Sequence, residues 1–273
     1  MKKSIAVSLF CFLIISLAEA DTSERNFSLK TVDSFEIGVQ SYLYEYEEEV
    51  EGAFFMSNKG TKYGFSASAT KTLADAYYLK GEFRYATGDV EYKSASGVAD
   101  VPDDLYEMRL VVANEKIVDG FLLGSYIGVG YRVLENDLRD LGSGGYRRTS
   151  HYLYIPIGVN HRFKVGKDAR ISTNIEYDYF AWGEQKSYLS DVGPWQAIVF
   201  GDPVNEQKSG YGFRINSAYE QQSWSIGAFF NYWKIEDSEK NYYYDGMYTY
   251  TLYEQSEPKN TTKEVGVELK YRF

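Results

Sequence analysis

The sequence is poor in several residue types that many proteins depend on. It has one cysteine, five prolines and two histidines. Cys11 lies in the first apolar run, so the remainder of the chain forms no intramolecular disulfide. The net charge of −10 and the lack of a basic stripe exclude a nucleic-acid partner. Beyond the first twenty residues no apolar run approaches the roughly 20 residues of a spanning helix.

The start of the chain has the order of an export signal. Lys2 and Lys3 form a positive region, and the stretch from Ile5 to Leu17 is almost wholly apolar. Ala18 and Ala20 then supply the small residues that a signal peptidase requires. The sequence therefore predicts a cleaved signal peptide at residues 1–20 and a short periplasmic segment at residues 21–32. A single domain is expected over residues 33–273.

Aromatic residues are abundant although the chain as a whole is polar. There are 27 Tyr, 16 Phe and 4 Trp, while the mean hydropathy is −0.41. A core of long helices would favour Leu and Ala instead. Tyrosine together with glycine and alternating charge indicates β-structure with one apolar face and one wet face.

Ten segments alternate apolar and polar residues with a period of two, which is typical of strands. In the fifth, Ile127, Val129 and Tyr131 share one face, and Gly128 and Arg132 share the other. Pro156 in the sixth predicts a local distortion because proline lacks the ladder donor. The segments cover residues 35–43, 62–69, 77–85, 106–112, 121–133, 152–162, 170–179, 211–220, 224–232 and 264–273.

Short and long connections alternate strictly between these segments. This asymmetry is typical of transmembrane barrels, which have tight periplasmic turns and longer external loops. An even number of strands returns both termini to the periplasmic side. The short connections are predicted near Leu73–Ala76, Glu115–Gly120, Lys164–Asp168 and Glu220–Ser223, and the long ones at Glu47–Gly60, Thr87–Asp104, Leu134–Ser150, Trp182–Ser209 and Glu236–Thr262.

The polar face carries too many charges for an ordinary soluble sandwich. In a closed barrel the apolar face meets lipid, every backbone group is paired, and the charges line the lumen. We therefore predict an all-β fold, a transmembrane antiparallel up-and-down barrel of about ten strands (8–12). Its narrow or plugged polar lumen is expected to hold an ion network of Lys80, Glu82, Arg84, Glu107, Arg109, Arg132, Arg162, Arg170, Glu176, Asp178, Arg214, Glu268, Lys270 and Arg272. Aromatic girdles are expected at Tyr85, Tyr106, Tyr131, Tyr179, Tyr219 and Trp224.

The chain end supports a resemblance to a known class. Leu269, Tyr271 and Phe273 alternate to a terminal phenylalanine, and with the signal and ten strands the sequence resembles small outer-membrane β-barrel proteins of Gram-negative bacteria. The resemblance implies that these three residues form the signal read by the barrel-assembly machinery. Glu268 stands where the class usually has glycine. It also implies a location in the bacterial outer membrane, in contact with lipid and lipopolysaccharide.

Catalytic candidates are sparse. The chain is similar in strand count to the omptin proteases, but neither histidine sits in their Asp-x-His arrangement. Asp103, Asp104 and His151 fall near one rim, although no spacing brings them within the reach that general-base catalysis requires. A lipid esterase would need Ser150 and His151 on one face, whereas adjacent strand residues point to opposite faces. No catalytic role is expected for His161, and no cofactor is predicted.

The external loops hold the remaining candidates. Glu47, Glu48 and Glu49 are candidate ligands for a divalent cation, and a solvated acidic loop is the alternative. Arg147 and Arg148 are candidate contacts for lipid phosphates. The last loop is rich in tyrosine, which suits either a contact surface or an aromatic β-ribbon. Residues 182–209, with Pro194, Trp195 and the apolar run at 198–200, form a further candidate surface.

These features favour a non-enzymatic surface protein for adhesion, contact with a host or extracellular ligand, or envelope maintenance. A narrow channel for small solutes is an alternative. A rim hydrolase, either an omptin-like protease or a lipid esterase, is the third hypothesis.

Overall fold

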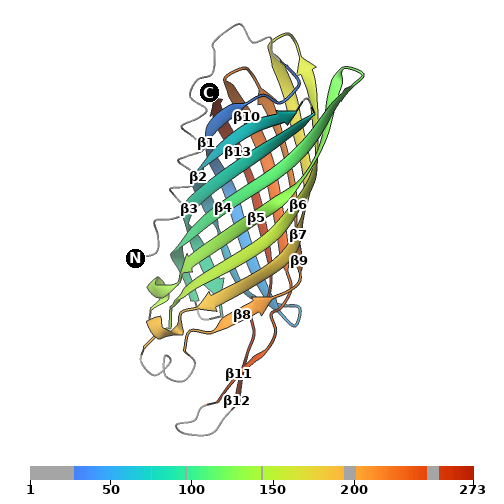
Figure 1. The fold of residues 1–273 in the computed structure, drawn as a ribbon. Helices are drawn as coiled ribbons and strands as arrows, with labels where there is room; N and C mark the ends of the chain where they lie inside the picture. The colour runs from blue at the N-terminus through green and yellow to red at the C-terminus, as the bar shows by residue number, and fades with distance from the viewer. Residues whose placement is uncertain (1–27, 75, 96, 143, 194–200, 245–251) are drawn as a thin grey trace, which may run out of the picture.

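The computed structural model describes residues 28–273, apart from residues 75, 96, 143, 194–200 and 245–251. Ten long antiparallel strands close into a tilted barrel (Figure 1). The barrel strands are β1 (Ser34–Val50), β2 (Ala53–Ala74), β3 (Tyr77–Ser94), β4 (Gly97–Val118), β5 (Phe121–Asp137), β6 (Arg147–Val165), β7 (Ala169–Ser187), β9 (Gly210–Glu220), β10 (Trp224–Ile235) and β13 (Lys259–Arg272).

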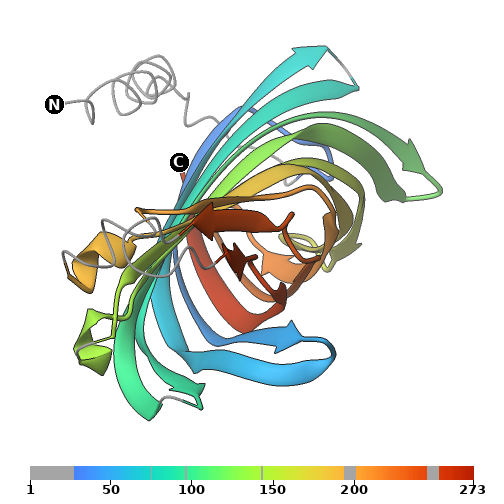
Figure 2. The same cartoon turned by 90° about the horizontal axis from the view of Figure 1, so that it is seen from below.

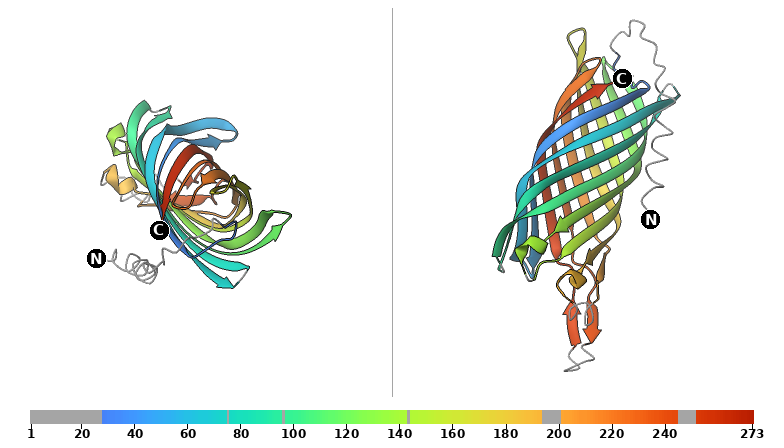
Figure 3. Two further views of the ribbon diagram at one scale, coloured as in Figure 1. Left: turned by 90° about the horizontal axis from the view of Figure 1, so that it is seen from above. Right: turned by 90° about the vertical axis from the view of Figure 1, so that its left-hand side faces the viewer.

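Three further strands lie at one end of the barrel. β8 (Val204–Gln207) pairs with the last residues of β7. It therefore extends the β7–β9 pairing on the side that precedes Gly210, the first residue of β9. β11 (Asn241–Tyr244) and β12 (Leu252–Gln255) form a separate hairpin that projects beyond the barrel (Figure 3). Two 3₁₀ turns, η1 (Arg139–Leu141) and η2 (Leu189–Asp191), complete the regular structure of the described residues. Among the residues that the structure describes, no helix is long and apolar enough to cross a membrane.

The ring closes where the first and last strands meet. β1 pairs with β13 from Glu36–Arg272 to Glu49–Lys259, and β6 pairs with β7, so no strand edge stays open around the wall (Figure 2). Going round the barrel, the order is β1, β2, β3, β4, β5, β6, β7, β9, β10, β13. The predicted all-β, ten-strand up-and-down barrel is therefore confirmed.

The two ends of the barrel differ in their connections. One end, here called the short-turn end, carries the turns after β2, β4, β6 and β9 together with the chain terminus. Asp119 and Gly120 both have positive φ there, as a two-residue hairpin turn requires. The opposite end is called the long-hairpin end. It carries the β11–β12 hairpin and both 3₁₀ turns.

Two of the connections predicted as long loops are mostly strand. β1 runs to Val50 and β2 starts at Ala53, so the predicted loop Glu47–Gly60 is a hairpin tip turning at Glu51 and Gly52, both with positive φ. The predicted loop Thr87–Asp104 is likewise the paired ends of β3 and β4. Polar residues misled the prediction because a hairpin that stands in water needs no apolar outer face.

The wall of the barrel is apolar outside and polar inside. On β1, Val39 and Leu43 are 62% and 66% exposed, whereas Gln40 and Tyr42 between them are 7% and 2% exposed. The same exposed alternation recurs on the other strands and defines a continuous apolar belt. Towards the long-hairpin end the belt finishes in exposed tyrosines, and beyond it most outward positions of the strands are polar or charged, as at Glu45.

The aromatic edges of the belt form cross-strand pairs. The rings of Tyr85 and Tyr106 pack in a tilted arrangement with centroids 5.0 Å apart at the long-hairpin edge. Tyr219 and Trp224 lie 5.8 Å apart at the short-turn edge. Tilted aromatic pairs of this kind stabilise neighbouring strands and suit an interface between apolar and aqueous surroundings.

Candidate functional site: the barrel interior

A layer of buried ion pairs crosses the middle of the lumen. Arg214 donates to Glu107 from Nη2 at 2.5 Å and to Asp178 from Nε at 2.6 Å. Tyr154 donates its hydroxyl to the same Glu107 at 2.7 Å. These four residues come from β9, β4, β7 and β6, so the layer ties distant strands together.

Glu264 of β13 is the second centre of this layer. It is fully buried, and it accepts hydrogen bonds from Arg132 at 2.8 Å, from Asn231 at 2.8 Å and from Arg84. A carboxylate removed from water needs such charge-assisted partners, since an unpaired buried charge is strongly unfavourable.

All fourteen residues of the predicted ion network lie on the inner face and are ion-paired. The pairs not yet described are Lys80–Glu82, Arg84–Glu107, Arg109–Glu176, Arg109–Glu82, Arg162–Glu115, Arg170–Glu220, Arg214–Glu176, Lys270–Glu268 and Arg272 with Glu36 and Glu220. Strand parity placed these side chains inside, but it did not indicate which carboxylate each cation would meet.

Above the ion layer, the long-hairpin half of the lumen is filled by an aromatic core. Trp233 is 1% exposed, and its ring meets that of Tyr154 edge-on at 5.0 Å. Lys62 lies over the ring of Tyr44 at 4.1 Å and pairs with Asp103, with all three buried. The core comprises Tyr42, Tyr44, Tyr46, Met56, Ala86, Val90, Tyr92, Val101, Leu105, Leu134, Leu138, Tyr152, Tyr154, Phe180, Trp233 and Ile235.

A second charged cluster closes the lumen at the long-hairpin end, beyond the belt. Arg148 donates through one nitrogen both to Glu48 and to Glu257, the latter at 2.5 Å. Burial, reinforced by the charge of Glu48 and opposed by Arg148, raises the pKa of Glu257 to about 8. Ser238 and Glu257 exchange hydrogen bonds of 2.9 and 2.7 Å at the base of the β11–β12 hairpin. The cluster thus fastens this hairpin to the barrel.

Below the ion layer, the short-turn half of the lumen encloses a cavity of about 640 Å³. Its lining alternates cations and carboxylates, for example Lys80 with Glu82 and Lys270 with Glu268, among small polar residues such as Ser66. A volume of this size lies within the usual range of small-molecule sites.

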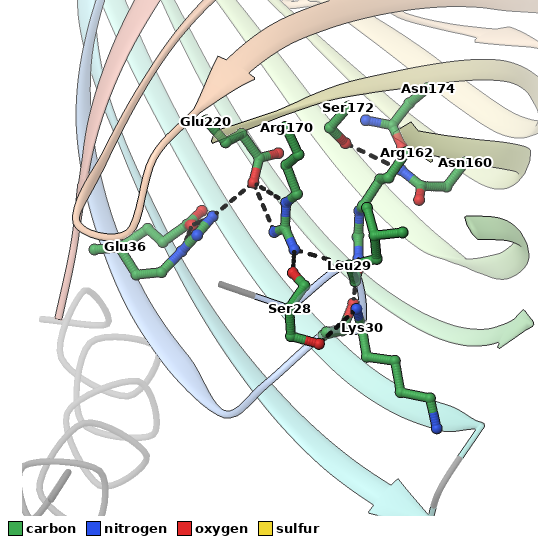
Figure 4. A network of polar contacts seen from close by, with 12 residues as sticks. Ser28, Leu29, Lys30, Glu36, Asn160, Arg162, Arg170, Ser172, Asn174 and Glu220 are labelled. Atoms are coloured by element: carbon green, nitrogen blue, oxygen red, sulfur yellow. Dashed lines mark hydrogen bonds and ion pairs between the residues drawn. The ribbon is translucent and has the colours of Figure 1, made fainter. Parts of the chain in front are cut away.

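The segment before β1 crosses the mouth of this cavity (Figure 4). Arg170 donates to the carbonyl oxygens of Ser28 at 2.6 Å and Leu29 at 3.2 Å, and Arg162 donates to Leu29 at 3.3 Å. Glu115 accepts from the backbone N–H of Thr31 at 2.7 Å and from its hydroxyl at 2.8 Å. Residues 28–31 are therefore bound within the barrel mouth. Sequence reasoning assigned residues 21–32 simply to a periplasmic segment; residues 21–27 lie outside the described chain.

The structure does not assemble the candidate catalytic residues. Asp103 points into the core towards Lys62, whereas Asp104 points outward and accepts from Tyr85 at 3.1 Å. His151 is also on the outer face, where its Nδ1 is 2.8 Å from the hydroxyl of Tyr131. Within the described chain, no hydrogen bond joins either aspartate to His151.

The remaining candidate side chains follow the same parity rule. Ser150 points inward and donates to Gln185 at 2.9 Å, away from His151 on the outside. His161 packs on the belt between Phe121 and Phe163, each ring 5.5 Å away. Within the part of the chain that the structure describes, neither residue has a hydrogen-bond partner suited to proton transfer.

The three candidate cation ligands point in different directions. Glu48 is 1% exposed inside the lumen, whereas Glu47 binds Lys59 at 2.8 Å and Glu49 binds Lys259 at 2.7 Å on the outer face. Among the described residues, no group of three or more His, Cys, Asp or Glu side chains is arranged to hold a metal ion.

The adjacent arginines Arg147 and Arg148 point to opposite faces of β6. Arg147 is exposed and pairs with Asp191 of η2 at 2.8 Å, whereas Arg148 is buried in the lumen cluster. Of these two candidate contacts for lipid phosphates, only Arg147 is exposed, because strand alternation turns its neighbour inward. The candidate residues Pro194 and Trp195, with the run at 198–200, lie outside the described residues.

The predicted assembly residues lie on the outer face of the barrel, two in β13 and Phe273 directly after it. Leu269, Tyr271 and Phe273 are 50%, 51% and 57% exposed, and Phe273 packs against Phe35 of β1 with centroids 5.9 Å apart. The end of the chain thus presents a row of exposed apolar side chains beside the β1–β13 pairing that closes the barrel.

Five glutamates that lie inside the barrel were not predicted to belong to the ion network. Glu36, Glu220 and Glu264 had the inward parity but were not assigned to the network. Glu115 was placed in a turn and Glu48 in a loop, so parity could not be applied to them. Extending the alternation through the polar ends of the strands would have found both.

Comparison with known proteins places the fold. No family model and no curated protein sequence matches the chain. Among solved structures, the outer-membrane protease OmpT of Escherichia coli matches with a TM-score of 0.51 and 11% identity, covering 90% of this chain and 100% of OmpT. A FadL homologue of Pseudomonas aeruginosa (TM-score 0.42, 7% identity, 88% and 90% coverage) and the attachment protein Ail of Yersinia pestis (0.34, 12%, 89% and 100%) are more distant. The chain has the fold of the outer-membrane β-barrels, at the size of OmpT.

Proposed function

We propose that this protein is a closed barrel of the bacterial outer membrane that presents rigid hairpins for surface contact and conducts no solute. The observation that carries the proposal is the filled long-hairpin half of the lumen, where Trp233 and Tyr154 lie buried in the aromatic core above the buried ion pairs. In this proposal the apolar belt faces lipid, the short-turn end faces the periplasm, and the outer stripe of β13 is read by the assembly machinery.

Exposed apolar side chains beyond the belt support a contact role. Phe54 and Phe55 at the tip of the β1–β2 hairpin are 55% and 50% exposed, Val98 at the β3–β4 tip is 60% exposed, and Tyr242 of β11 is 57% exposed. Apolar groups held at hairpin tips in water are typical of protein contact surfaces. Lipopolysaccharide around the belt and an extracellular ligand at the tips are the proposed partners.

Conductance separates a closed barrel from a channel. The purified full chain, inserted into planar lipid bilayers in 1 M KCl, is expected to give no stable single-channel steps. Heat-modifiable migration of the same sample on a denaturing gel verifies that the barrel is folded. Reproducible steps from the heat-modifiable form would overturn the closed-barrel proposal.

Adhesion tests the hairpin tips. Cells displaying the protein are applied to plates coated with laminin, fibronectin, collagen or mucin. The F54S/F55S variant is expected to reduce attachment at least fivefold, whereas the polar control K208S, an exposed residue paired with Glu239, leaves it unchanged. Equal attachment of all displayed forms and of cells without the protein would refute a contact role on these surfaces.

A further inference from the structure

The binding of residues 28–31 has the form of peptide recognition. Most of the interactions are with the backbone of the segment. Arg162 and Arg170 donate hydrogen bonds to two successive carbonyl groups (Figure 4). Glu115 accepts a hydrogen bond from one backbone N–H. Two side chains add to them. Leu29 is 6% exposed, and Thr31 both donates to Glu115 and accepts from Arg162 at 2.7 Å.

Residues 28–31 lie across the opening of the barrel at the short-turn end. The segment enters β1 at Ser34, while its partners Arg162 and Arg170 stand on β6 and β7. β6 is five strands from β1 in either direction around the ring, so the segment spans the full diameter of the short-turn end. Behind it lies the polar cavity, whose lining includes Ser28 and Thr31.

The wall groups that hold the segment do not depend on it for charge balance. Arg162 also pairs with Glu115, and Arg170 pairs with Glu220 at 2.7 Å. When the segment leaves, each guanidinium keeps a carboxylate, and the freed N–H donors meet water from the cavity. Because no charge is left unpaired, the release of the segment carries no large electrostatic penalty.

We propose that Glu115, Arg162 and Arg170 form a binding site for an extended peptide, occupied in the free protein by the chain's own residues 28–31. An incoming peptide with a leucine and, two residues later, a threonine reproduces the contacts of Leu29 and Thr31. Displacement of the segment opens the cavity to the short-turn side. That this side faces the periplasm rests on the proposed function; the binding itself does not.

The test compares proteins in which the chain's own segment does or does not compete with an added peptide for the site. The tethered segment acts at an effective concentration in the millimolar range, so it suppresses a free peptide of the same sequence. The L29G/T31P variant removes the buried side chain, the hydroxyl and the N–H that bonds Glu115, and it leaves the wall intact. V32S changes an exposed neighbour, 43% exposed, and is the matched control.

Binding is measured by fluorescence anisotropy of a blocked, labelled peptide of residues 28–33, using the full chain in detergent and verified by heat-modifiability. The expected affinity for L29G/T31P is at least tenfold higher than for the unmodified protein or V32S. Adding R162L to L29G/T31P is expected to remove that gain, whereas adding K80L, at a cavity lysine that pairs with Glu82, preserves it. Equal affinity of all forms, or a gain that R162L leaves intact, would overturn the proposal.

A second measurement covers the case in which the double variant does not fold. In the otherwise unmodified chain, T31C is labelled with a bulky maleimide. An excess of the unlabelled peptide of residues 28–33 is expected to raise the labelling rate at least threefold, while a scrambled peptide has no effect. A rate that does not respond to the peptide contradicts an exchangeable site.

Discussion

The two halves of the lumen have the same alternation of inward and outward residues but opposite interiors. In the long-hairpin half, the inward residues of β1 are Tyr42, Tyr44 and Tyr46, all buried in the aromatic core. In the short-turn half, β1 contributes Ser34 and the small Gly38, and the interior is a cavity of about 640 Å³.

The difference shows that side-chain size, rather than strand number, decides whether this barrel is plugged. A ring of about ten strands is slightly wider than one that side chains fill readily. Tyrosine and tryptophan span the extra width, whereas Ser66, Ser68 and Thr70 of β2 leave it open. One half is therefore packed like the core of a soluble protein, and the other half resembles a binding site.

The largest contrast is expected between two glutamates of β13. In E264L the fully buried Arg132 loses its ion-pair partner, which is expected to lower the free energy of unfolding by about 3–5 kcal/mol. E268L removes the partner of Lys270 and of the Ser66 hydroxyl, both of which line the cavity, and is expected to cost under about 1 kcal/mol. Urea titration of the protein in lipid vesicles, followed by tryptophan fluorescence, compares the two. Equal losses would contradict a packed half and a hydrated half.

Aromatic residues of β10 test the packing itself. W233A removes a ring that is 1% exposed and packed on Tyr154, so a loss of about 3 kcal/mol is expected. Phe229 lies at the boundary, with its ring 5.8 Å from that of Tyr42 and one side lining the cavity. F229A is therefore expected to cost about half as much. The same titration, followed by circular dichroism because W233A removes a fluorophore, measures both. A larger loss for F229A than for W233A would contradict the conclusion that the long-hairpin half of the lumen is the more densely packed.

Much of this fold could be predicted from the sequence because period-two alternation directly encodes the two faces of a strand. It gave the ten strands, the closed barrel and the inward charges, such as Arg132 and Arg214. The alternation does not encode which strands face each other across the lumen. Arg214 of β9 meets Glu107 of β4 through a contact that depends on ring size and stagger.

The ends of the barrel were harder to predict for a different reason. Outside lipid, the outward positions of a hairpin can be polar, so the apolar signal that marks a strand fades and β1 to Val50 looked like a loop. The cluster of Glu48, Arg148 and Glu257 joins three distant segments and has no local signature. The segment at residues 28–31 shows no strand pattern, and only the structure places it across the mouth.

Acidity is expected to affect the two ends in opposite directions. The pKa of Glu257 is raised to about 8, so between about pH 4.5 and pH 8 the docked hairpin retains a proton that a free one loses, and docking weakens as pH rises. At the other end, burial alone would raise the pKa of Asp33, but hydrogen bonds from Lys71 and Thr72 lower it to about 2. Its contribution is therefore present above about pH 3.8 and lost as pH falls towards 2.

Chymotrypsin cleavage of the β11–β12 hairpin measures the first effect, normalised to an unstructured peptide at each pH. Docking is expected to weaken by about 2 kcal/mol from pH 6 to pH 8. E257Q, which is neutral at every pH, is expected to remove the dependence, whereas E239Q at an exposed site retains it. A pH dependence that survives in E257Q would assign the titration to another group.

The smallest effect separates two inward glycines. A Cβ at Gly130 would lie 2.1 Å from the ring of Tyr154, which Trp233 and Arg214 hold in place, so G130A is expected to cost about 1 kcal/mol through overpacking. A Cβ at Gly38 would lie 2.8 Å from the side chains of Lys270 and Ser66 and 3.0 Å from the carbonyl oxygen of Leu269, and the two side chains have the cavity to move into. G38A is therefore expected to change stability by less than about 0.5 kcal/mol. If G38A proved the more damaging substitution, the short-turn half would be as rigidly packed as the aromatic core.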